Sequence, residues 1–440
     1  MPNLLEIASL ACEVADKEGA EWVQATVSES LNISIELAKS SLKAASAAAL
    51  QGLSIRAFVK GGLGSSSTND LSEAAVRRLA KEAAQMAKAA EPDPDFLALP
   101  SPEEGCEVEG LFDQEIAGLP SQELVRLAAR NIESAKSVFP EVILSGVVGL
   151  HSGHSAVANS AGVRRERRST SIGASTFAVV KRGADIGSFF DFDSGHTLAD
   201  VELEDLGAKA TKRALTFLGA KRVKTKRMAL VLGPLASFSL LRSLAYFSNA
   251  EDIQRRRSFM TNMSGKRIAS EQLSLLDDGL IPRGLSSGAY DGEGAPRRRV
   301  TLIDNGIFVN LLHNSYTANK AGETNTGHGT SGGGISPTNL HPALGKRKSQ
   351  EIIKDTQEGI YINMGALGPN PTSGDISASV DFGFKIQNGE LAYPVINAMI
   401  GGHIFDILSE IDAVSSDYRE EPGNIMPTIR IQDVQVAGKM

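Results

Sequence analysis

Cysteines and long apolar runs are scarce in this chain, and each shortage excludes a class of structure. Two cysteines among 440 residues, Cys12 and Cys106, cannot build a disulfide framework or a four-thiolate zinc site. The least polar long stretch, residues 228–241, is too short to span a bilayer and contains Gly233 and Pro234. The sequence therefore predicts a protein with reduced thiols and no membrane partner.

Positive charge and aromatic residues are also in short supply. The chain has 45 lysines and arginines against 52 aspartates and glutamates, and aromatic residues make up 5% of it. An acidic chain is a poor candidate for phosphate-backbone binding, and a stacking groove needs aromatics interleaved with basic residues. We therefore expect no nucleic-acid partner and interpret the basic clusters as solvated faces or a protein interface. The clusters are Arg164, Arg165, Arg167 and Arg168, and residues 221–227, 255–257 and 297–299.

The overall composition predicts a folded protein of several domains. Hydrophobic residues make up 42% and charged residues 22%, which is ordinary for a globular chain. The first ten residues carry Glu6 and no basic residue, unlike a secretory signal, so a cytoplasmic location is expected. A Pro-, Asp- and Glu-rich stretch from Glu91 to Glu109 predicts a linker. We predict domains over residues 1–92, 93–222 and 223–440.

Hydrophobic periodicity in the first half predicts helices and alternating strands. Helical spacing covers residues 4–15 and 76–90, whereas period-2 alternation covers residues 23–27, 31–37 and 53–59. Ser28–Ser30 is interpreted as a hairpin turn between two of these strands. Residues 142–150 and 156–160 are likewise predicted as two separate strands.

The second half is predicted to be mainly strands and turns. Asn305-Gly306 and Asn388-Gly389 are strong hairpin signals, because both central positions of a type I′ turn need a positive φ. Residues 376–387 alternate and predict one strand. The Gly/Ser/Thr-rich segment Gly322–His341 is interpreted as a mobile surface loop.

The histidines do not form a hydrolytic zinc motif. None of the seven is followed by the glutamate that would deprotonate a metal-bound water. His151 and His154 form an HxxH pair that could supply two ligands, and His313, His328 and His341 flank the glycine-rich segment. Hydrogen-bonded or surface histidines are the simpler interpretation for all of them.

Three short motifs are interpreted as turns. Gly284–Gly288 has the letters of a nucleophile elbow, but no helix is expected to follow it. Asp291–Gly294 and Asn370–Asp375 bring carboxylates into dense turns without identifiable catalytic partners.

Several segments together resemble the TldD/PmbA family. The C-terminal positions that carry the resemblance are Asp291, Glu293 and Gly294, then Asn370, Pro371, Gly374 and Asp375, then Asn388 and Gly389. Residues 52–56 and 68–72 resemble the family's first domain, and residues 208–218 with 228–234 resemble its central junction. The resemblance covers nearly the whole chain. It implies an α+β fold, with an N-terminal α/β domain carrying helices on a sheet and a larger C-terminal domain rich in antiparallel strands.

The resemblance extends to one branch of that family. The TldD branch carries a His-Glu-x-x-x-His zinc motif in the helix after the strand at residues 228–232, plus a cysteine ligand near its C-terminus. Aligned by eye, Arg242, Ser243 and Phe247 occupy the three motif positions, and residues 424–431 contain no cysteine. The chain thus resembles the metal-free PmbA branch, also called TldE. His403 departs from the branch pattern and is expected to act at an interface if it acts at all.

The resemblance implies a non-catalytic subunit of a cytosolic peptidase complex. Zinc and the catalytic glutamate would belong to a TldD-type partner, and this chain would carry no cofactor. The family is associated with trimming precursor peptides and degrading small unfolded substrates. A homodimer remains an alternative assembly, and an independent metal-dependent hydrolase using other histidines, such as His151 with His154, remains an alternative function.

Overall fold

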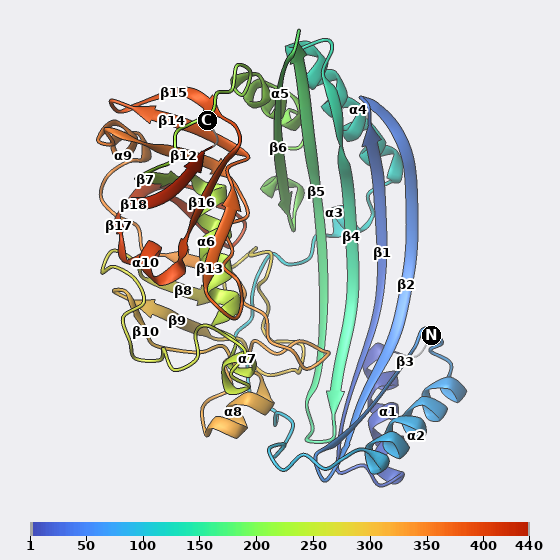
Figure 1. Ribbon diagram of the computed structural model, residues 1–440. Coiled ribbons are helices and arrows are strands. Elements are labelled where there is room, and N and C mark those ends of the chain that lie inside the picture. Colours follow the sequence, from blue (N-terminus) through green and yellow to red (C-terminus); the bar gives the residue numbers. More distant parts are fainter. Residues whose placement is uncertain (1–2, 439–440) are drawn as a thin grey trace.

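The computed structural model describes residues 3–438. Residues 1–2, at the start of the predicted first domain, and residues 439–440, at the end of the predicted last domain, lie outside the described residues. Within the described range the chain forms three sheets, and a six-stranded antiparallel sheet stands beside a strand-rich C-terminal region (Figure 1). The predicted α+β class is confirmed.

The six-stranded sheet is built on four long strands. They are β1 (Trp22–Ala38), β2 (Ser41–Val59), β4 (Ile143–Asn159) and β5 (Arg164–Arg182), of 17, 19, 17 and 19 residues. The shorter β3 (Gly62–Thr68) and β6 (Asp185–Gly195) complete the order β3-β2-β1-β4-β5-β6. Since a typical strand has about 5–6 residues, these four are exceptional.

The predicted turn at Ser28–Ser30 and the predicted break after Leu150 are both wrong. Both segments continue their strands, and Glu29 pairs with Gln51 on one side and His154 on the other. The polar residues occur midway along the sheet, between two hydrophobic cores that cover its ends. The hydrophobic alternation therefore lapses there because the covering helices stop, while the backbone ladder continues.

Helices cover one face of this sheet at its two ends. At one end α1 (Leu4–Lys17) and α2 (Glu73–Ala89) pack on the face that carries Val23, Ala25 and Val27. At the other end α4 (Ser121–Val138) and α5 (Leu206–Thr216) cover the face that carries Ile33, Ile35 and Leu37. The short α3 (Gln114–Ala117) and the 3-10 turn Leu198–Asp200 complete this half. The C-terminal region lies beside the sheet, next to β6 and β5 (Figure 1).

The C-terminal region contains the other two sheets. The larger has the order β13-β16-β18-β7-β12-β14-β15, with β17 paired to β18, and only β7 and β12 run parallel among its described pairs. Its strands are β7 (Lys226–Leu232), β12 (Glu358–Met364), β13 (Asp375–Ser379), β14 (Phe382–Gln387), β15 (Glu390–Val395), β16 (Ala398–His403), β17 (Ile411–Glu421) and β18 (Asn424–Gly438). The smaller has the order β10-β9-β8-β11, from β8 (Leu275–Asp278), β9 (Arg299–Asp304), β10 (Ile307–Phe308) and β11 (Leu340–Pro342). The helices here are α6 (Pro234–Phe247), α7 (Ala250–Gln254), α8 (Ser315–Ala321), α9 (Ser349–Lys354) and α10 (Ile404–Ser409).

Both predicted hairpins are confirmed by their backbone angles. Asn305 and Gly306 have φ of 45° and 80°, and Asn388 and Gly389 have φ of 49° and 80°. The single strand predicted over residues 376–387 is wrong, because β13 and β14 occupy different places in the sheet. Alternation continues across the break because each strand buries one face, although each has different neighbours.

The glycine-rich segment Gly322–His341 is not a loose surface loop, so that prediction is also wrong. His328, Asn339 and Leu340 are 1%, 0% and 0% exposed. The segment has few apolar side chains to pack, but the carboxylates of Asp277 and Asp291 accept hydrogen bonds from its backbone N–H groups. Hydrogen bonding fixes this segment where hydrophobic burial could not.

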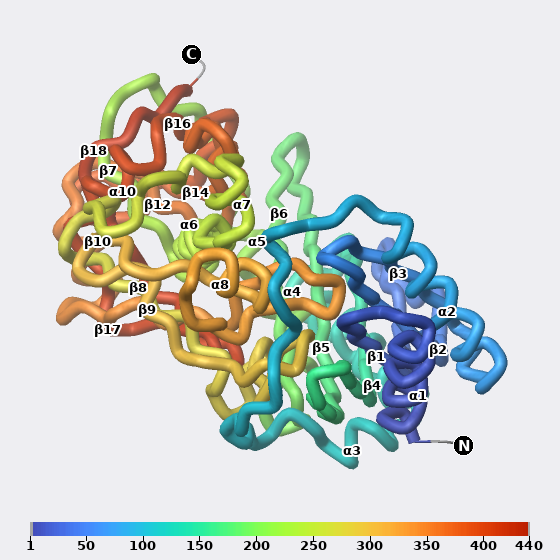
Figure 2. The backbone as a smooth tube through the Cα atoms, turned by 90° about the horizontal axis from the view of Figure 1, so that it is seen from below, coloured from blue at the N-terminus to red at the C-terminus, as the bar shows by residue number. Residues whose placement is uncertain are grey.

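The predicted linker crosses between the two halves as an irregular segment (Figure 2). Tyr316 of α8 donates a hydrogen bond to Asp93 at 3.0 Å, and Asn319 donates to the carbonyl oxygen of Ala98 at 3.1 Å. The segment is therefore attached to the C-terminal region. Among the described helices, none has the length and apolar character needed to cross a bilayer.

Candidate functional site

Helix α6 carries the three positions that the resemblance equates with a zinc motif. Strand β7 leads into Gly233, whose N–H donates to the carbonyl oxygen of Ile362, and Pro234 then begins the helix. Arg242 is exposed, while Ser243 and Phe247 are half-buried. Ser243 donates its hydroxyl to the backbone carbonyl of Ser239 at 2.9 Å.

These three side chains do not fit a zinc ion. Zinc in proteins is bound by imidazole nitrogen, thiolate sulfur or carboxylate oxygen. Guanidinium has no free lone pair and a phenyl ring offers no donor atom. Among residues 3–438, no group of three His, Cys, Asp or Glu side chains is arranged to hold a metal ion.

Aromatic side chains fill the space beyond α6. The ring of Phe247 lies 5.1 Å from that of Phe259, and Phe259 lies 5.6 Å from Phe405, both in edge-on contacts. His403 continues the row, with its ring 5.2 Å from Phe405. The end of α6 thus meets an apolar row in which the histidine is the terminal member.

The turn of Asn370, Pro371, Gly374 and Asp375 lies beside this row. Asn370 accepts hydrogen bonds from the N–H groups of Thr372 and Ser373, and the carbonyl oxygen of Pro371 accepts from the N–H of Phe259. Gly374 has a φ of 77°, and His403 Nε2 is 2.8 Å from the position a Cβ there would take. Asp375 is exposed. The predicted turn is confirmed, and it supports the position of His403.

His151 and His154 cannot share one ion, because both lie on strand β4 three residues apart. Residues with odd separation in a strand point to opposite faces of the sheet. His151 is hydrogen-bonded to Asn32 at 2.8 Å, whereas His154 lies 4.0 Å from Glu166. The pair that would have carried an independent metal-dependent hydrolase is therefore divided by the sheet.

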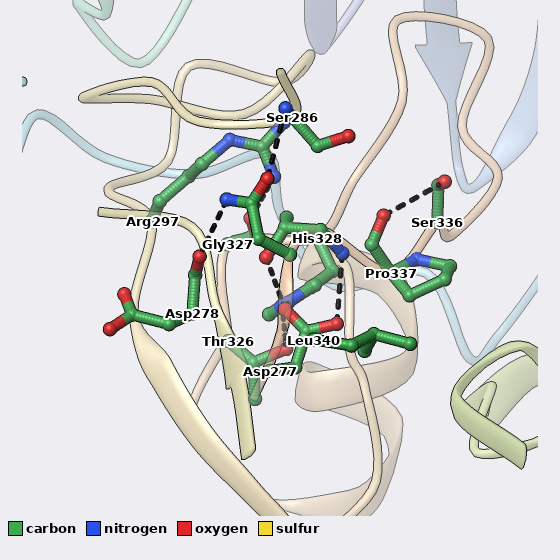
Figure 3. Close-up of polar contacts among 12 residues, drawn as sticks. Asp277, Asp278, Ser286, Arg297, Thr326, Gly327, His328, Ser336, Pro337 and Leu340 are labelled. Atoms are coloured by element: carbon green, nitrogen blue, oxygen red, sulfur yellow. Dashed lines mark hydrogen bonds and ion pairs between the residues drawn. The ribbon is translucent and has the colours of Figure 1, made fainter. Parts of the chain in front are cut away.

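A buried polar cluster, not predicted as such from the sequence, surrounds Asp277 and His328. Both side chains are fully buried, with His328 Nε2 3.0 Å from a carboxylate oxygen of Asp277. Nδ1 of His328 lies 3.0 Å from the hydroxyl of Thr326, so the ring sits between Asp277 and Thr326 (Figure 3). Asp277 also accepts from the backbone N–H of Thr338 at 2.8 Å and from its hydroxyl.

The Asp291–Gly294 turn belongs to the same region of the molecule. Asp291 accepts hydrogen bonds from the N–H groups of Glu293, Ala295 and Gly329 at 2.9, 3.0 and 2.7 Å. Burial, and then the nearby charge of Glu293, raise the pKa of Asp291 to about 7, against the opposing effect of these hydrogen bonds. Its carboxyl group therefore titrates near neutral pH.

Glu293 connects this turn to both halves of the chain. Its carboxylate accepts from the N–H and the hydroxyl of Ser315 at 2.9 and 2.7 Å. Its other oxygen lies 3.6 Å from a guanidinium nitrogen of Arg56, which comes from β2 of the long sheet. No partner of Arg56 or Asp277 could be predicted from the sequence, because Glu293 is more than 200 positions from Arg56 and His328 is 51 positions from Asp277.

This cluster has the chemistry of a structural network. A catalytic His–Asp pair must reach a substrate, and the side chains of Asp277 and His328 have no exposed surface. Ser287, in the Gly284–Gly288 turn, accepts from Asn339 at 2.8 Å, and no helix follows it. The Asn388-Gly389 turn lies elsewhere, with the N–H of Gly389 donating to the carbonyl oxygen of Thr356. The motif residues therefore occupy separate places in the fold.

The fold places the chain in a class of α+β proteins that includes a solved relative. The structure of TldE from Thermococcus kodakarensis superposes with a TM-score of 0.90, covering 98% of this chain and 100% of that one. Sequence identity is 24%, so this likeness establishes the architecture.

Family membership follows from the sequence itself. Models of the PmbA/TldA metallopeptidase domain 1, central domain and C-terminal domain match residues 23–87, 114–218 and 225–438. The chain belongs to the PmbA/TldD metallopeptidase family. Metalloprotease PmbA of Escherichia coli O157:H7 is 25% identical, over 99% of this chain and 96% of that protein. Protein MJ0231 of Methanocaldococcus jannaschii is 26% identical, over 90% of this chain and 92% of that protein.

Proposed function

We propose that this chain is the metal-free subunit of a TldD/TldE-type metallopeptidase complex that acts on small or unfolded peptides. The proposal is carried by helix α6, where the family resemblance equates Arg242, Ser243 and Phe247 with a His-Glu-x-x-x-His motif and none of the three side chains can bind zinc. In such a complex, zinc in the TldD-type partner would polarise the peptide carbonyl of the substrate and activate the water that hydrolyses it. This chain then contributes binding surface to the complex.

A free sheet edge supports a role in holding extended peptides. Strand β3 pairs only with residues 53–59 of β2, which leaves residues 41–52 unpaired on their outer side within the described structure. Leu42 and Leu50 on this edge are 46% and 58% exposed. An extended peptide can add to such an edge through backbone hydrogen bonds that do not depend on its sequence.

The proposal is tested by reconstitution. The chain purified without chelator is expected to hold well below one zinc per molecule by elemental analysis, and to leave an unfolded peptide intact. Mixing it with a TldD-type partner should give cleavage, which should stop when the partner's zinc-binding histidines are replaced.

Changes in this chain provide the control. Replacing His151 and His154 together with alanine should leave cleavage by the mixture unchanged. Near-stoichiometric zinc in the isolated chain, or cleavage by the chain alone that those replacements abolish, would instead show an independent hydrolase.

A further inference from the structure

Two of the basic clusters, far apart in sequence, meet between the long sheet and the C-terminal region. Nη1 of Arg167 and Nε of Arg297 lie 3.6 and 3.7 Å from the point where a side chain on Gly288 would begin. Arg167 comes from β5, and Arg297 lies two residues before the start of β9. Both guanidinium groups therefore approach the same small volume beside the Gly284–Gly288 turn.

Neither group has the partners that its charge requires. Arg167 makes no hydrogen bond or ion pair with any described residue. Nε of Arg297 is buried without an acceptor, and Nη1 of Arg297 donates to the carbonyl oxygen of Gly327 at 3.4 Å. Arg165, two positions earlier on the same face, stacks on Tyr290 at 4.1 Å and donates to the carbonyl oxygen of Glu103. Arg165 thus has an aromatic contact and an acceptor for one nitrogen, although its Nε is buried without a partner.

The charge balance around the two groups is positive. Desolvation lowers the pKa of both Arg167 and Arg297, and the charge of Arg167 lowers the pKa of Arg297 further. The negative charges of Asp291 and Asp277 act in the opposite direction and raise the pKa of Arg297, although neither carboxylate lies within ion-pair distance of it. Burial and then Arg167 also lower the pKa of His151.

A cavity of about 190 Å³ opens at this point. Seven of its lining residues have polar side chains, namely His151, Arg167, Ser169, Thr170, Ser171, His196 and Ser287. Arg297 is not part of the lining and approaches from the side of Gly288, next to Ser287. Both ring nitrogens of His196 face carbonyl oxygens, of Thr170 and Gly284, which can only accept hydrogen bonds. The other polar groups that line the cavity are mainly the N–H donors of Arg167 and the hydroxyl groups of serine and threonine.

We propose that this cavity binds a small oxyanion on Arg167, on the side that Arg297 approaches. Guanidinium groups match the oxygens of a carboxylate, phosphate or sulfate group through paired N–H donors, and the serine hydroxyls can donate to the remaining oxygens. The anion would supply Arg167 with an acceptor and offset the positive charge that Arg167 and Arg297 bring to this place. A water takes up roughly 30 Å³, so the cavity has room for an oxyanion and a few waters.

The first test is calorimetric titration of the full chain with sodium sulfate at constant ionic strength. Arg167→Gln should weaken sulfate binding at least tenfold, because a charge-assisted pair is lost. Arg168→Gln is the matched control: it removes the same charge one position along β5, where the side chain lines a different cavity beside His154. Its sulfate affinity should equal that of the unaltered chain.

Gly288→Asp gives an independent second test, because it should place a carboxylate next to both Arg167 and Arg297. Gly288 does not have a positive φ, and the nearest backbone atom, the carbonyl oxygen of Tyr290, is 3.4 Å from the added Cβ. The substitution should raise the melting temperature and abolish sulfate binding. Equal sulfate binding by all three variants, or selenate located elsewhere in crystals, would overturn the proposal.

A final comparison distinguishes the natural sources of the anion. A short peptide with a free C-terminus that competes with sulfate, where its amidated counterpart does not, would identify a peptide carboxylate. Competition by phosphate alone would identify an inorganic or phosphoryl group. Both results support the oxyanion site, and binding that does not depend on Arg167 refutes it.

Discussion

At the scale of single residues, the buried carboxylates of the C-terminal region hold irregular backbone in place. Asp277 and Asp291 accept from N–H groups of the glycine-rich segment, and Glu293 accepts from α8. Asp277 and Asp291 satisfy donors outside regular secondary structure, and Glu293 satisfies a donor at the first residue of α8; an unpaired buried N–H at any of these places would be costly. Asp291 and Glu293 could be recognised as a motif from the sequence, but their partners could not.

Asp277→Ala should be strongly destabilising, because it leaves His328 and Thr338 without their acceptor in a site that water does not reach. The expected loss is about 3 kcal/mol of unfolding free energy, measured by urea denaturation. Asp381→Ala, at an exposed position, is the control and should change stability by no more than about 0.5 kcal/mol. Equal losses in the two variants would contradict the structural role of the pair.

Stability should also depend on pH through Asp291. Its pKa of about 7 in the folded chain exceeds the ordinary 3.8, so the folded state binds this proton more tightly than the unfolded state. The stabilisation is complete below about pH 4 and is lost as the pH rises through 7, by about 4 kcal/mol at most.

Asp291→Asn should remove this dependence while costing some stability at every pH, because an amide has fewer acceptor sites. Urea denaturation between pH 4 and 8 should show a flatter profile for the variant. Parallel profiles for the two proteins would show that Asp291 is ionised throughout.

At the scale of elements, the segment Gly322–His341 shows why composition can mislead. Its Gly-, Ser- and Thr-rich sequence predicts a mobile loop, yet it passes through the protein with its backbone hydrogen-bonded. The continuous strands β1 and β4 give the converse error, since polar residues at Ser28–Ser30 suggested a turn. In both cases the decisive partners are distant in sequence, whereas the Asn-Gly hairpins, which depend on local angles, were predicted correctly.

Glycine substitutions test whether the glycine-rich segment is an integral part of the fold. Gly327 has a φ of 71°, and a Cβ there would lie 2.1 Å from the carbonyl oxygen of Pro296. Gly327→Ala should therefore cost at least about 2 kcal/mol and expose the segment to limited proteolysis. Gly332→Ala, where no atom lies within 4 Å, should leave both unchanged. Similar proteolysis of both variants would argue for a segment that is already mobile.

At the scale of the whole molecule, the two halves are joined at separate points along the long sheet. Near α5, Phe382 of β14 meets Phe189 and Phe217 edge-on, with ring centroids 5.4 and 5.6 Å apart. At the other end of the sheet, Arg56 approaches Glu293. The sequence predicted the fold class through family resemblance, but it could not show these connections, because periodicity describes a face and not its neighbour.

Phe382→Ala should weaken the aromatic connection and cost about 2–3 kcal/mol, less than for a fully buried phenylalanine. Calorimetry should show a lower melting temperature and a broader transition as the halves become less coupled. Leu391→Ala, at an exposed site on the neighbouring strand β15, is the control and should have little effect. An unchanged transition in the Phe382 variant would mean that the halves are joined mainly elsewhere.

The length of β2 and β5 has a mechanical consequence. At about 3.3 Å per residue, a strand of 19 residues extends roughly 60 Å, and its hydrogen bonds to neighbours of similar length prevent it from bending independently. Such a sheet is expected to move as one rigid body. A small rotation imposed near α4 would swing the far tip, which carries α1 and α2, through a much larger arc.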